Sequence, residues 1–334
     1  SMRNINAIAG LTNGELETLS QSVLDFGKNT RSGALEASDA LYTVFSAGIT
    51  SVDDAMAAMR ISTMTAEAGL ADLTVTTESM VASLLAYGDT SEGFSLRVSD
   101  ALTQMVAVGV GSMEEFASAM GNVVPTASAM GMSIEELYGN MAFLTQRGLT
   151  AAKASTSLNA ALTSLAKPTK AMEAAFSQLG VNGAEQLIDK FDGVNGALEA
   201  LIGTTDGTQA SIQALFNNIR GARAINLFAQ DIEGWRASMQ EFNSSLDGAT
   251  LRAWEQQMES FAAKVGKAQS ALQGAAIVIG NQIMPMVEPL ITGFSELMHS
   301  VSSLSPEVLQ MGVAFSTVIA IAAPLMWLLG SLIT

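Results

Sequence analysis

Three helix patterns in close succession between residues 112 and 168 restrict the fold of this chain more than any other feature of its sequence. Apolar residues recur three or four positions apart in each pattern, over 113–127, 134–144 and 158–165, which places them on one face of a helix. Ser112 and Ser133 each stand three residues before a glutamate, which is the spacing of a capping box. The turns between the patterns are very short, so we predict three helices packed as helical hairpins.

The composition agrees with a helical protein. Hydrophobic residues make up 49% of the 334 residues and charged residues only 14%, while runs of aromatic and β-branched residues typical of strands are scarce. We therefore predict an all-α fold of helical-hairpin repeats, followed by a long coiled-coil-like helix and a hydrophobic C-terminal helix. The net charge of −16 argues against nucleic acid as a partner, and the lack of cysteine excludes disulfides and thiolate sites.

An internal repeat is indicated by the similarity of two segments, 38–59 and 99–120, at an offset of 61 residues. Allowing small gaps, the alignment continues with Thr76 opposite Ser133, and it predicts two copies over about 38–98 and 99–162. Such repeats are typical of stacked helical units that bury their apolar faces on one another. We divide the chain into an N-terminal arm, a helical repeat domain, a helical connector, a long coiled-coil-like helix and a hydrophobic segment: 1–33, 34–180, 181–249, 250–297 and 305–334.

A long apolar seam is predicted over residues 250–284, with Thr250 as the N-cap of one unbroken helix. The seam could pack on the chain's own domain or form a coiled coil between identical chains. We favour a parallel trimer, because bulky aromatic residues at d positions, Trp254 and Phe261, do not suit a two-stranded zipper. The seam residues alternate in steps of three and four: Leu251, Trp254, Met258, Phe261, Val265, Ala268, Leu272, Ala275 and Ile279.

The C-terminal stretch 308–334 has no charged residue and is long enough to cross a hydrocarbon core of ~30 Å. We predict a membrane-competent segment over 305–334, with a very apolar helix buried in an oligomer as the alternative. The residues expected to face lipid are Val313, Ile319, Ile321, Leu325, Trp327 and Leu328.

The sequence has no pattern that predicts catalysis. His299 stands in an apolar context without a second ligand at metal-binding spacing. Ser164 and Lys167 have the S-x-x-K spacing of acyl-transfer enzymes, but they lie within an amphipathic helix and the companion motifs are absent. We therefore predict a protein that is not an enzyme and has no cofactor and no metal site.

Five segments in a fixed order resemble the conserved N-terminal region of phage tail tape measure proteins, which are minor tail proteins of long-tailed phages and prophages. One of them, 219–228, includes two of the few basic residues, Arg220 and Arg223. The similar segments are 39–56, 121–172, 177–181, 219–228 and 279–307.

The resemblance implies a structural protein that sets the length of the tail tube during assembly and assists DNA passage through the host envelope. It implies a homo-oligomer, with tail-tube proteins, tail-tip proteins, tail assembly chaperones and the host membrane as partners, and no sequence-specific nucleic-acid binding. The expected location is the lumen of the virion tail, with the host cytoplasm during assembly and the host membrane on ejection. Family members are usually much longer, so we expect a fragment or processed N-terminal portion.

Two other functions remain open from the residues alone. The hydrophobic segment 305–334 is compatible with a membrane-inserting, pore-forming or toxin-like helical protein. The 19 methionines are compatible with a helical adaptor module that presents an adaptable groove to a partner helix.

Overall fold

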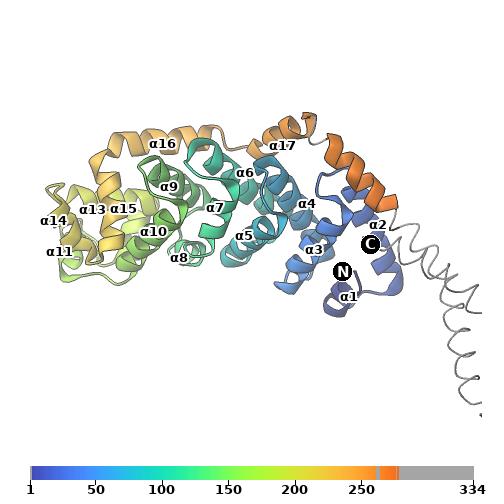
Figure 1. The fold of residues 1–334 in the computed structure, drawn as a ribbon. Coiled ribbons are helices and arrows are strands. Elements are labelled where there is room, and N and C mark those ends of the chain that lie inside the picture. The colour runs from blue at the N-terminus through green and yellow to red at the C-terminus, as the bar shows by residue number, and fades with distance from the viewer. Residues whose placement is uncertain (1, 261–263, 276, 278–334) are drawn as a thin grey trace, which may run out of the picture. The chain divides into compact units, whose positions relative to one another are not determined.

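A computed structural model describes residues 2–260, 264–275 and 277 of the chain, and Figure 1 shows its fold. The described residues form helices joined by turns and contain no strand, which confirms the predicted all-α class. The chain divides into two compact units, Ser1–Gly274 and Ala275–Thr334.

The helices of the first unit are mostly short, and residues 264–275 add a further helical stretch after the last of them. Their bounds are α1 Met2–Ala9, α2 Asn13–Gly27, α3 Gly33–Ser46, α4 Val52–Gly69, α5 Leu73–Tyr87, α6 Glu92–Val108, α7 Met113–Met120, α8 Val124–Ala129, α9 Ile134–Gln146, α10 Ala151–Ala166, α11 Lys170–Gln178, α12 Ala184–Lys190, α13 Val194–Gly203, α14 Gln209–Phe216, α15 Ile219–Gln230, α16 Ile232–Ser244 and α17 Ala249–Glu259.

The helix pattern expected over 113–127 is divided into two helices, α7 and α8, so the stretch from 112 to 168 contains four helices instead of three. Pro125 stands at the start of α8. A proline has no N–H to donate and its ring clashes with the carbonyl four residues earlier, which here belongs to Gly121. The apolar residues keep their helical spacing across the turn between α7 and α8, so the spacing alone did not reveal the break that the proline causes.

In the two copies of the predicted repeat, the N-cap residues of corresponding helices lie 61 positions apart, with no gap. Ser51 and Ser112 both cap helices through their side chains, and so do Asp72 and Ser133. The expected alignment of Thr76 with Ser133 is wrong, because Thr76 lies inside α5. The N-cap residues therefore align the two copies better than the gapped alignment does. The duplication itself stays a prediction.

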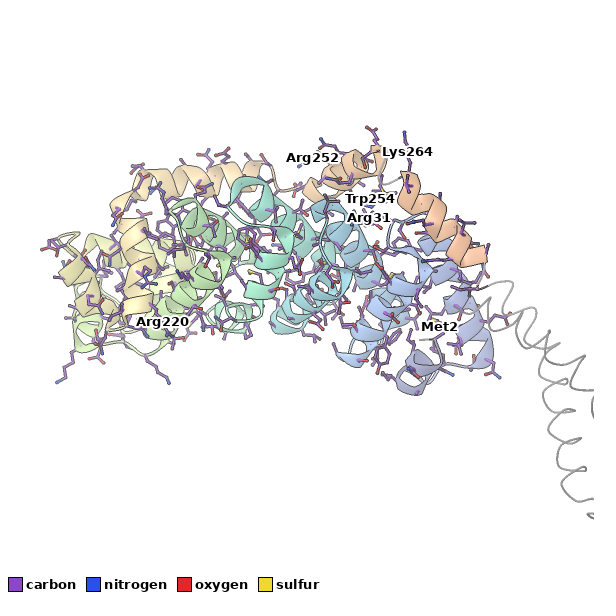
Figure 2. The ribbon with its side chains drawn as sticks, in the orientation of Figure 1. Met2, Arg31, Arg220, Arg252, Trp254 and Lys264 are labelled. Carbon is purple, nitrogen blue, oxygen red and sulfur yellow. The ribbon has the colours of Figure 1, made fainter. Side chains whose placement is uncertain are left out.

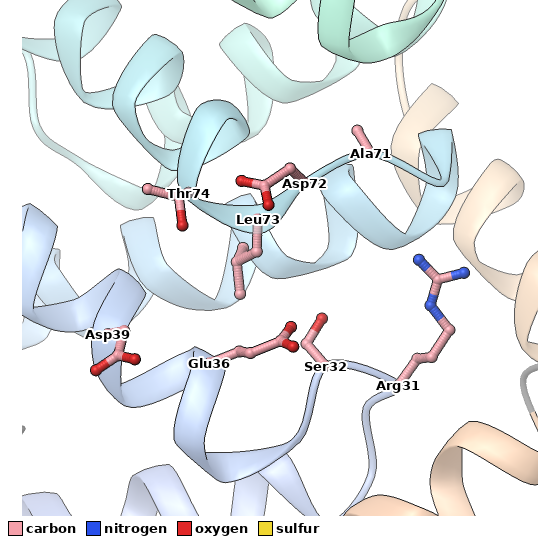
Figure 3. Close-up of a pocket in the computed structure, with 8 residues that line it drawn as sticks. All are labelled: Arg31, Ser32, Glu36, Asp39, Ala71, Asp72, Leu73 and Thr74. Carbon is pink, nitrogen blue, oxygen red and sulfur yellow. The ribbon is translucent and has the colours of Figure 1, made fainter.

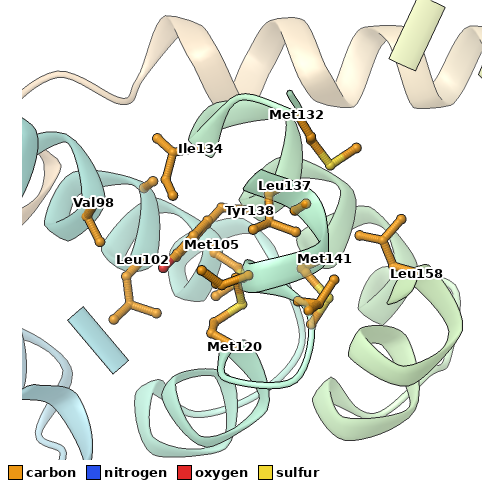
Figure 4. Close-up of a cluster of buried hydrophobic side chains, with 14 of the residues drawn as sticks. Val98, Leu102, Met105, Met120, Met132, Ile134, Leu137, Tyr138, Met141 and Leu158 are labelled. Atoms are coloured by element: carbon orange, nitrogen blue, oxygen red, sulfur yellow. The ribbon is translucent and has the colours of Figure 1, made fainter. Parts of the chain in front are cut away.

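A continuous core runs through the unit and is rich in methionine (Figure 4). Tyr138 of α9 is fully buried there, and its hydroxyl group is 3.1 Å from the hydroxyl group of Ser83. Methionine side chains fill irregular space between helices because they are unbranched and flexible. The side chains in this part of the core come from α6, α7, α9 and α10 and the turn before α9: Val98, Leu102, Met105, Met120, Met132, Ile134, Leu137, Tyr138, Met141 and Leu158.

The chain runs outward along this stack of helices and then returns over it. After α14, helix α15 packs on α10, α16 packs on α9, and α17 packs on α6 and α4 (Figure 1). The N-terminal arm also belongs to the stack, since α1 and α2 both pack on α3. The returning helices α15, α16 and α17 therefore contact helices far earlier in the sequence, and these contacts close the fold.

Candidate interaction site on the returning helices

Helix α15 approaches the backbone of α10 through a glycine. A Cβ atom at Gly221 would lie 3.0 Å from the backbone nitrogen of Ala161 and 3.1 Å from the carbonyl of Ala160. Backbone atoms of a packed helix cannot move aside as a flexible side chain can, so the absence of a side chain allows this crossing. Ile225 and Phe228 of α15 are buried as well, and the ring of Phe228 contacts that of Phe143 in α9.

Helix α16 is anchored on α9 by Trp235, whose side chain is almost completely buried. The indole Nε1 donates a hydrogen bond of 2.7 Å to Oδ1 of Asn140, which is itself buried. The indole ring stacks on the ring of Phe228, with 4.2 Å between the centroids. A buried tryptophan needs a partner for its N–H group, and Asn140 supplies it within an otherwise apolar contact.

Helix α17 begins on a buried carboxylate from a distant helix. Oδ2 of Asp100 accepts a hydrogen bond from the backbone N–H of Gly248, and Oδ1 accepts one from that of Thr250, both at 2.8 Å. A negative charge at this position also suits the positive end of the helix dipole. The helix starts at Ala249 with Gly248 as N-cap, so the expected N-cap Thr250 is wrong.

Thr250 instead joins a buried group of hydroxyl side chains. Its Oγ1 lies 2.6 Å from Oγ of Ser99 and 2.9 Å from Oγ1 of Thr103, and Ser99 lies 2.6 Å from Oγ1 of Thr65. These hydroxyl groups satisfy one another, as buried polar groups must. The surface of α4 and α6 under α17 is therefore polar.

A second buried carboxylate, Glu67 of α4, links α17 to the start of α3. Oε2 accepts a hydrogen bond of 2.8 Å from the indole Nε1 of Trp254. Oε1 accepts hydrogen bonds from the backbone N–H and the hydroxyl of Ser32, at 2.8 and 3.2 Å. Figure 2 labels Trp254 on α17. We call the residues that hold α17 the polar cluster: Thr65, Glu67, Ser99, Asp100, Thr103 and Thr250.

The predicted seam differs from the structure at Ser260. Helix α17 ends at Glu259, and Ser260 is extended, with φ −66° and ψ 153°, so the unbroken helix expected over 250–284 is interrupted there. The following helical stretch contacts the N-terminal arm, since Oγ of Ser270 donates a hydrogen bond of 3.0 Å to the carbonyl of Arg31. The periodicity gave no sign of this interruption, because the residues on both sides of Ser260 follow the same spacing.

The residues of the predicted seam differ in how far they are exposed to solvent. Three apolar members are exposed, by 47% at Leu251, 44% at Val265 and 72% at Leu272. Trp254 and Met258 are half-buried. Ala268 and Ala275 are exposed, whereas Phe261 and Ile279 lie outside the described residues.

The predicted membrane segment 305–334, with its six lipid-facing candidates, also lies outside the described residues. Of the helices that the structure describes, none has both the length and the apolar character that a membrane crossing requires.

An acidic cavity of about 490 Å³ lies between the start of α3 and the loop before α5 (Figure 3). Glu36, Asp39 and Asp72 line it together with Arg31. Burial raises the pKa of the Glu36 carboxyl above its usual value, and the negative charge of Asp72 adds to the effect. Within the described residues no group of acidic or histidine side chains has the arrangement of a metal site.

The serine of the S-x-x-K pattern, Ser164, has a structural role. Oγ of Ser164 donates hydrogen bonds to the carbonyls of Ala160 and Phe216, which ties α10 to the end of α14. The sequence analysis missed Glu67, Asp100 and Asn140, which accept hydrogen bonds from α16 and α17. Asp100 lies in the segment 99–120 of the internal repeat, and an acidic residue among small and apolar neighbours was the available signal.

The chain matches one protein family and two curated phage proteins. A model of the family described as phage-related minor tail protein matches residues 20–221. The tape measure protein of Pneumococcus phage Dp-1 is 26% identical over 344 aligned residues, covering 100% of this chain and 29% of that protein. A probable tape measure protein of Clostridium phage phiCD119 is 26% identical over 301 residues, covering 87% of this chain and 31% of its own length.

No solved structure matches the chain. The chain spans less than a third of the length of these two curated relatives. The similarity to the Dp-1 protein extends over the arm, the repeat region and the returning helices, and it agrees with the resemblance found in the sequence. The family model covers more than half of the chain, and this chain therefore belongs to the phage-related minor tail protein family, with tape measure proteins among its relatives.

Proposed function

We propose that this chain is part of a tape measure protein that sets the length of a phage tail tube during assembly and assists DNA passage through the host envelope. The similarity of the whole chain to a tape measure protein is the observation that carries the proposal. Its location is then the lumen of the virion tail, after assembly in the host cytoplasm, and its partners are the tail-tube and tail-tip proteins and the assembly chaperones.

Length setting is tested in the complete phage protein. Each residue of an extended helix contributes about 1.5 Å, so an in-frame deletion of about 60 residues should shorten the tail by about 90 Å. An in-frame duplication of the same segment should lengthen the tail by the same amount, and it serves as the control for loss of folding. Electron microscopy of virions measures both changes, and tails of unchanged length in both variants would contradict the proposal.

We also propose self-association through the exposed seam residues, most readily as a trimer. Leu251, Val265 and Leu272 are apolar and exposed, and covering them removes apolar surface from water. Trp254 is bonded to Glu67 of its own chain, so a seam that includes Trp254 requires α17 to leave the polar cluster. A seam limited to the exposed residues does not require this change.

The substitution Leu272→Glu tests self-association without disturbing the interior, because this side chain is exposed in the single chain. We expect analytical ultracentrifugation to show a trimer for the unaltered chain and a monomer for the variant, since three carboxylates would meet at the axis. The variant Gln269→Glu adds the same charge at an exposed neighbouring position and should remain trimeric. An unaltered chain that sediments as a monomer at micromolar concentrations would rule the trimer out.

The uncharged stretch 308–334 favours a second function, insertion into a membrane. Liposome flotation of the chain with and without residues 305–334 tests it. Flotation of the complete chain alone is expected, and equal partitioning of the two forms would exclude this function for the segment.

A further inference from the structure

Three basic side chains surround a hollow between the first turns of α10 and α15. Lys153 of α10 and Arg220 and Arg223 of α15 line a space of about 360 Å³ together with the hydroxyl groups of Thr156 and Ser157. All three basic residues are exposed, and Figure 2 marks Arg220 at the edge of the molecule. We call this feature the basic hollow (Lys153, Arg220 and Arg223).

The cations of the basic hollow differ from the arginines that join helices elsewhere in the chain. Arg60, Arg97 and Arg236 each form an ion pair with a carboxylate of another helix, and Arg147 forms one with Asp231, the N-cap of α16. No described carboxylate lies within ion-pair distance of a cation of the basic hollow. Helices α10 and α15 contain no acidic residue at all, in a chain whose net charge is −16.

The three cations also stand where helix electrostatics disfavour them. Lys153 is the third residue of α10, and Arg220 and Arg223 are the second and fifth residues of α15. The start of a helix carries a partial positive charge, so a cation there is repelled and an anion is attracted. Helices α7 and α9 follow the usual arrangement, with two glutamates in each first turn. Two helix starts and three unpaired cations around one hollow thus add to a local positive potential.

We propose that the basic hollow is a docking site for a carboxylate-rich segment of a partner protein. The guanidinium groups of Arg220 and Arg223 can each bind a carboxylate through two parallel hydrogen bonds, and Lys153 supplies a third charge. Ile219 next to them is 72% exposed, which offers an apolar contact to a peptide side chain. Duplex DNA fits less well, because its affinity depends on many phosphate contacts and the hollow supplies only three cations.

The test measures binding of a fluorescein-labelled peptide of ten glutamates to the full chain by fluorescence anisotropy at low ionic strength. The double variant Arg220→Glu/Arg223→Glu should weaken binding by about fivefold or more, since two exposed attractions become repulsions. The double variant Lys264→Glu/Lys267→Glu makes the same change in net charge outside the hollow and should weaken binding less than twofold. Circular dichroism melting shows that each variant is folded.

A conservative variant and a competing ligand sharpen the result. Arg220→Lys/Arg223→Lys keeps the charge and loses the paired hydrogen bonds, so its affinity should fall between those of the unaltered chain and the charge-reversed variant. Equal weakening by the two charge-reversed variants would overturn the proposal, because it would reflect net charge alone. Tighter binding of a labelled DNA duplex than of the glutamate peptide would overturn it as well, in favour of a phosphate ligand.

Discussion

Helices α16 and α17 both return over the same stack of helices, yet different forces hold them. Trp235 fixes α16 by a fully buried contact in which one hydrogen bond to Asn140 accompanies the stacked ring of Phe228. Helix α17 buries only Ala249 and Thr250 of its own residues, and its N-terminus and Trp254 depend on hydrogen bonds to buried carboxylates.

This difference determines the free-energy cost of exposing the surface beneath each helix when that helix separates from the stack. Apolar surface exposed by α16 costs free energy in proportion to its area. The hydroxyl and carboxylate groups beneath α17 can exchange their partners for water at a much lower net cost, because water offers equivalent hydrogen bonds. Helix α17 should therefore separate from the stack more readily than α16, which would free Trp254 for the proposed seam.

The largest expected effect compares the two tryptophans. Trp235→Ala removes a buried aromatic side chain and should lower the free energy of unfolding by about 3–5 kcal/mol. Trp254→Ala removes a half-buried side chain and one hydrogen bond, so a loss of about 1–3 kcal/mol is expected. Urea unfolding followed by circular dichroism measures both. Equal losses would mean that the two helices are held alike.

The next prediction concerns the close crossing of α15 and α10. Gly221→Ala places a Cβ atom against the backbone of Ala161 and should destabilise the fold by about 1–3 kcal/mol, as overpacking does. Gly14→Ala in α2 has no neighbouring atom within 4 Å and should be neutral or stabilise the chain by up to about 1 kcal/mol. Thermal unfolding compares the two variants, and a stabilising Gly221→Ala would show that the crossing is loose.

A smaller and local effect is expected at the start of α17. Asp100→Asn keeps the shape of the side chain but loses one of the two acceptors for the N–H groups of Gly248 and Thr250. A loss of about 1.4 kcal/mol corresponds to a tenfold change in an opening equilibrium. Hydrogen exchange of the amides of α17 should thus accelerate about tenfold, while those of α15 and α16 keep their rates. Faster exchange in all three helices would mean that they open as one unit.

The smallest effect is a pH dependence at the cap of α16. Hydrogen bonds from Arg147 and from the N–H of Gly234 lower the pKa of Asp231 below its usual value. A lowered pKa means that the stabilisation is complete above the unfolded pKa of about 3.9 and is lost as the pH falls through the folded value. NMR titration should place the Asp231 pKa below that of an exposed aspartate. In an Arg147→Gln variant it should rise, and an unchanged pKa would contradict the assigned cause.

Much of the local structure followed from the sequence. The capping boxes at Ser112 and Ser133 form as predicted, because they depend only on residues within one turn of each other. The break before Pro125 could have been predicted from the sequence, since a proline interrupts the helix in which it stands. The interruption at Ser260 was not, because its neighbours follow the same apolar spacing on both sides.

Most of the candidate site could not be predicted from the sequence. The spacing of Trp254 predicted an apolar seam, yet its indole group is bonded to Glu67, 187 residues earlier in the chain. Arg220 and Arg223 were visible as rare basic residues, but their proximity to Lys153 depends on the packing of α15 on α10.

The sequence by itself determined the helical class, the helix starts after Ser112 and Ser133, and the family, because short-range spacing and capping depend on residues close together in the chain. Only the tertiary structure decided that α15, α16 and α17 return over α10, α9, α6 and α4, and that Asp100 and Glu67 are buried acceptors for α17. The physical reason is that a hydrogen bond between distant residues leaves no periodic pattern in the sequence. Such a bond depends on which helices pack together, and many weak contacts along the whole chain determine that packing.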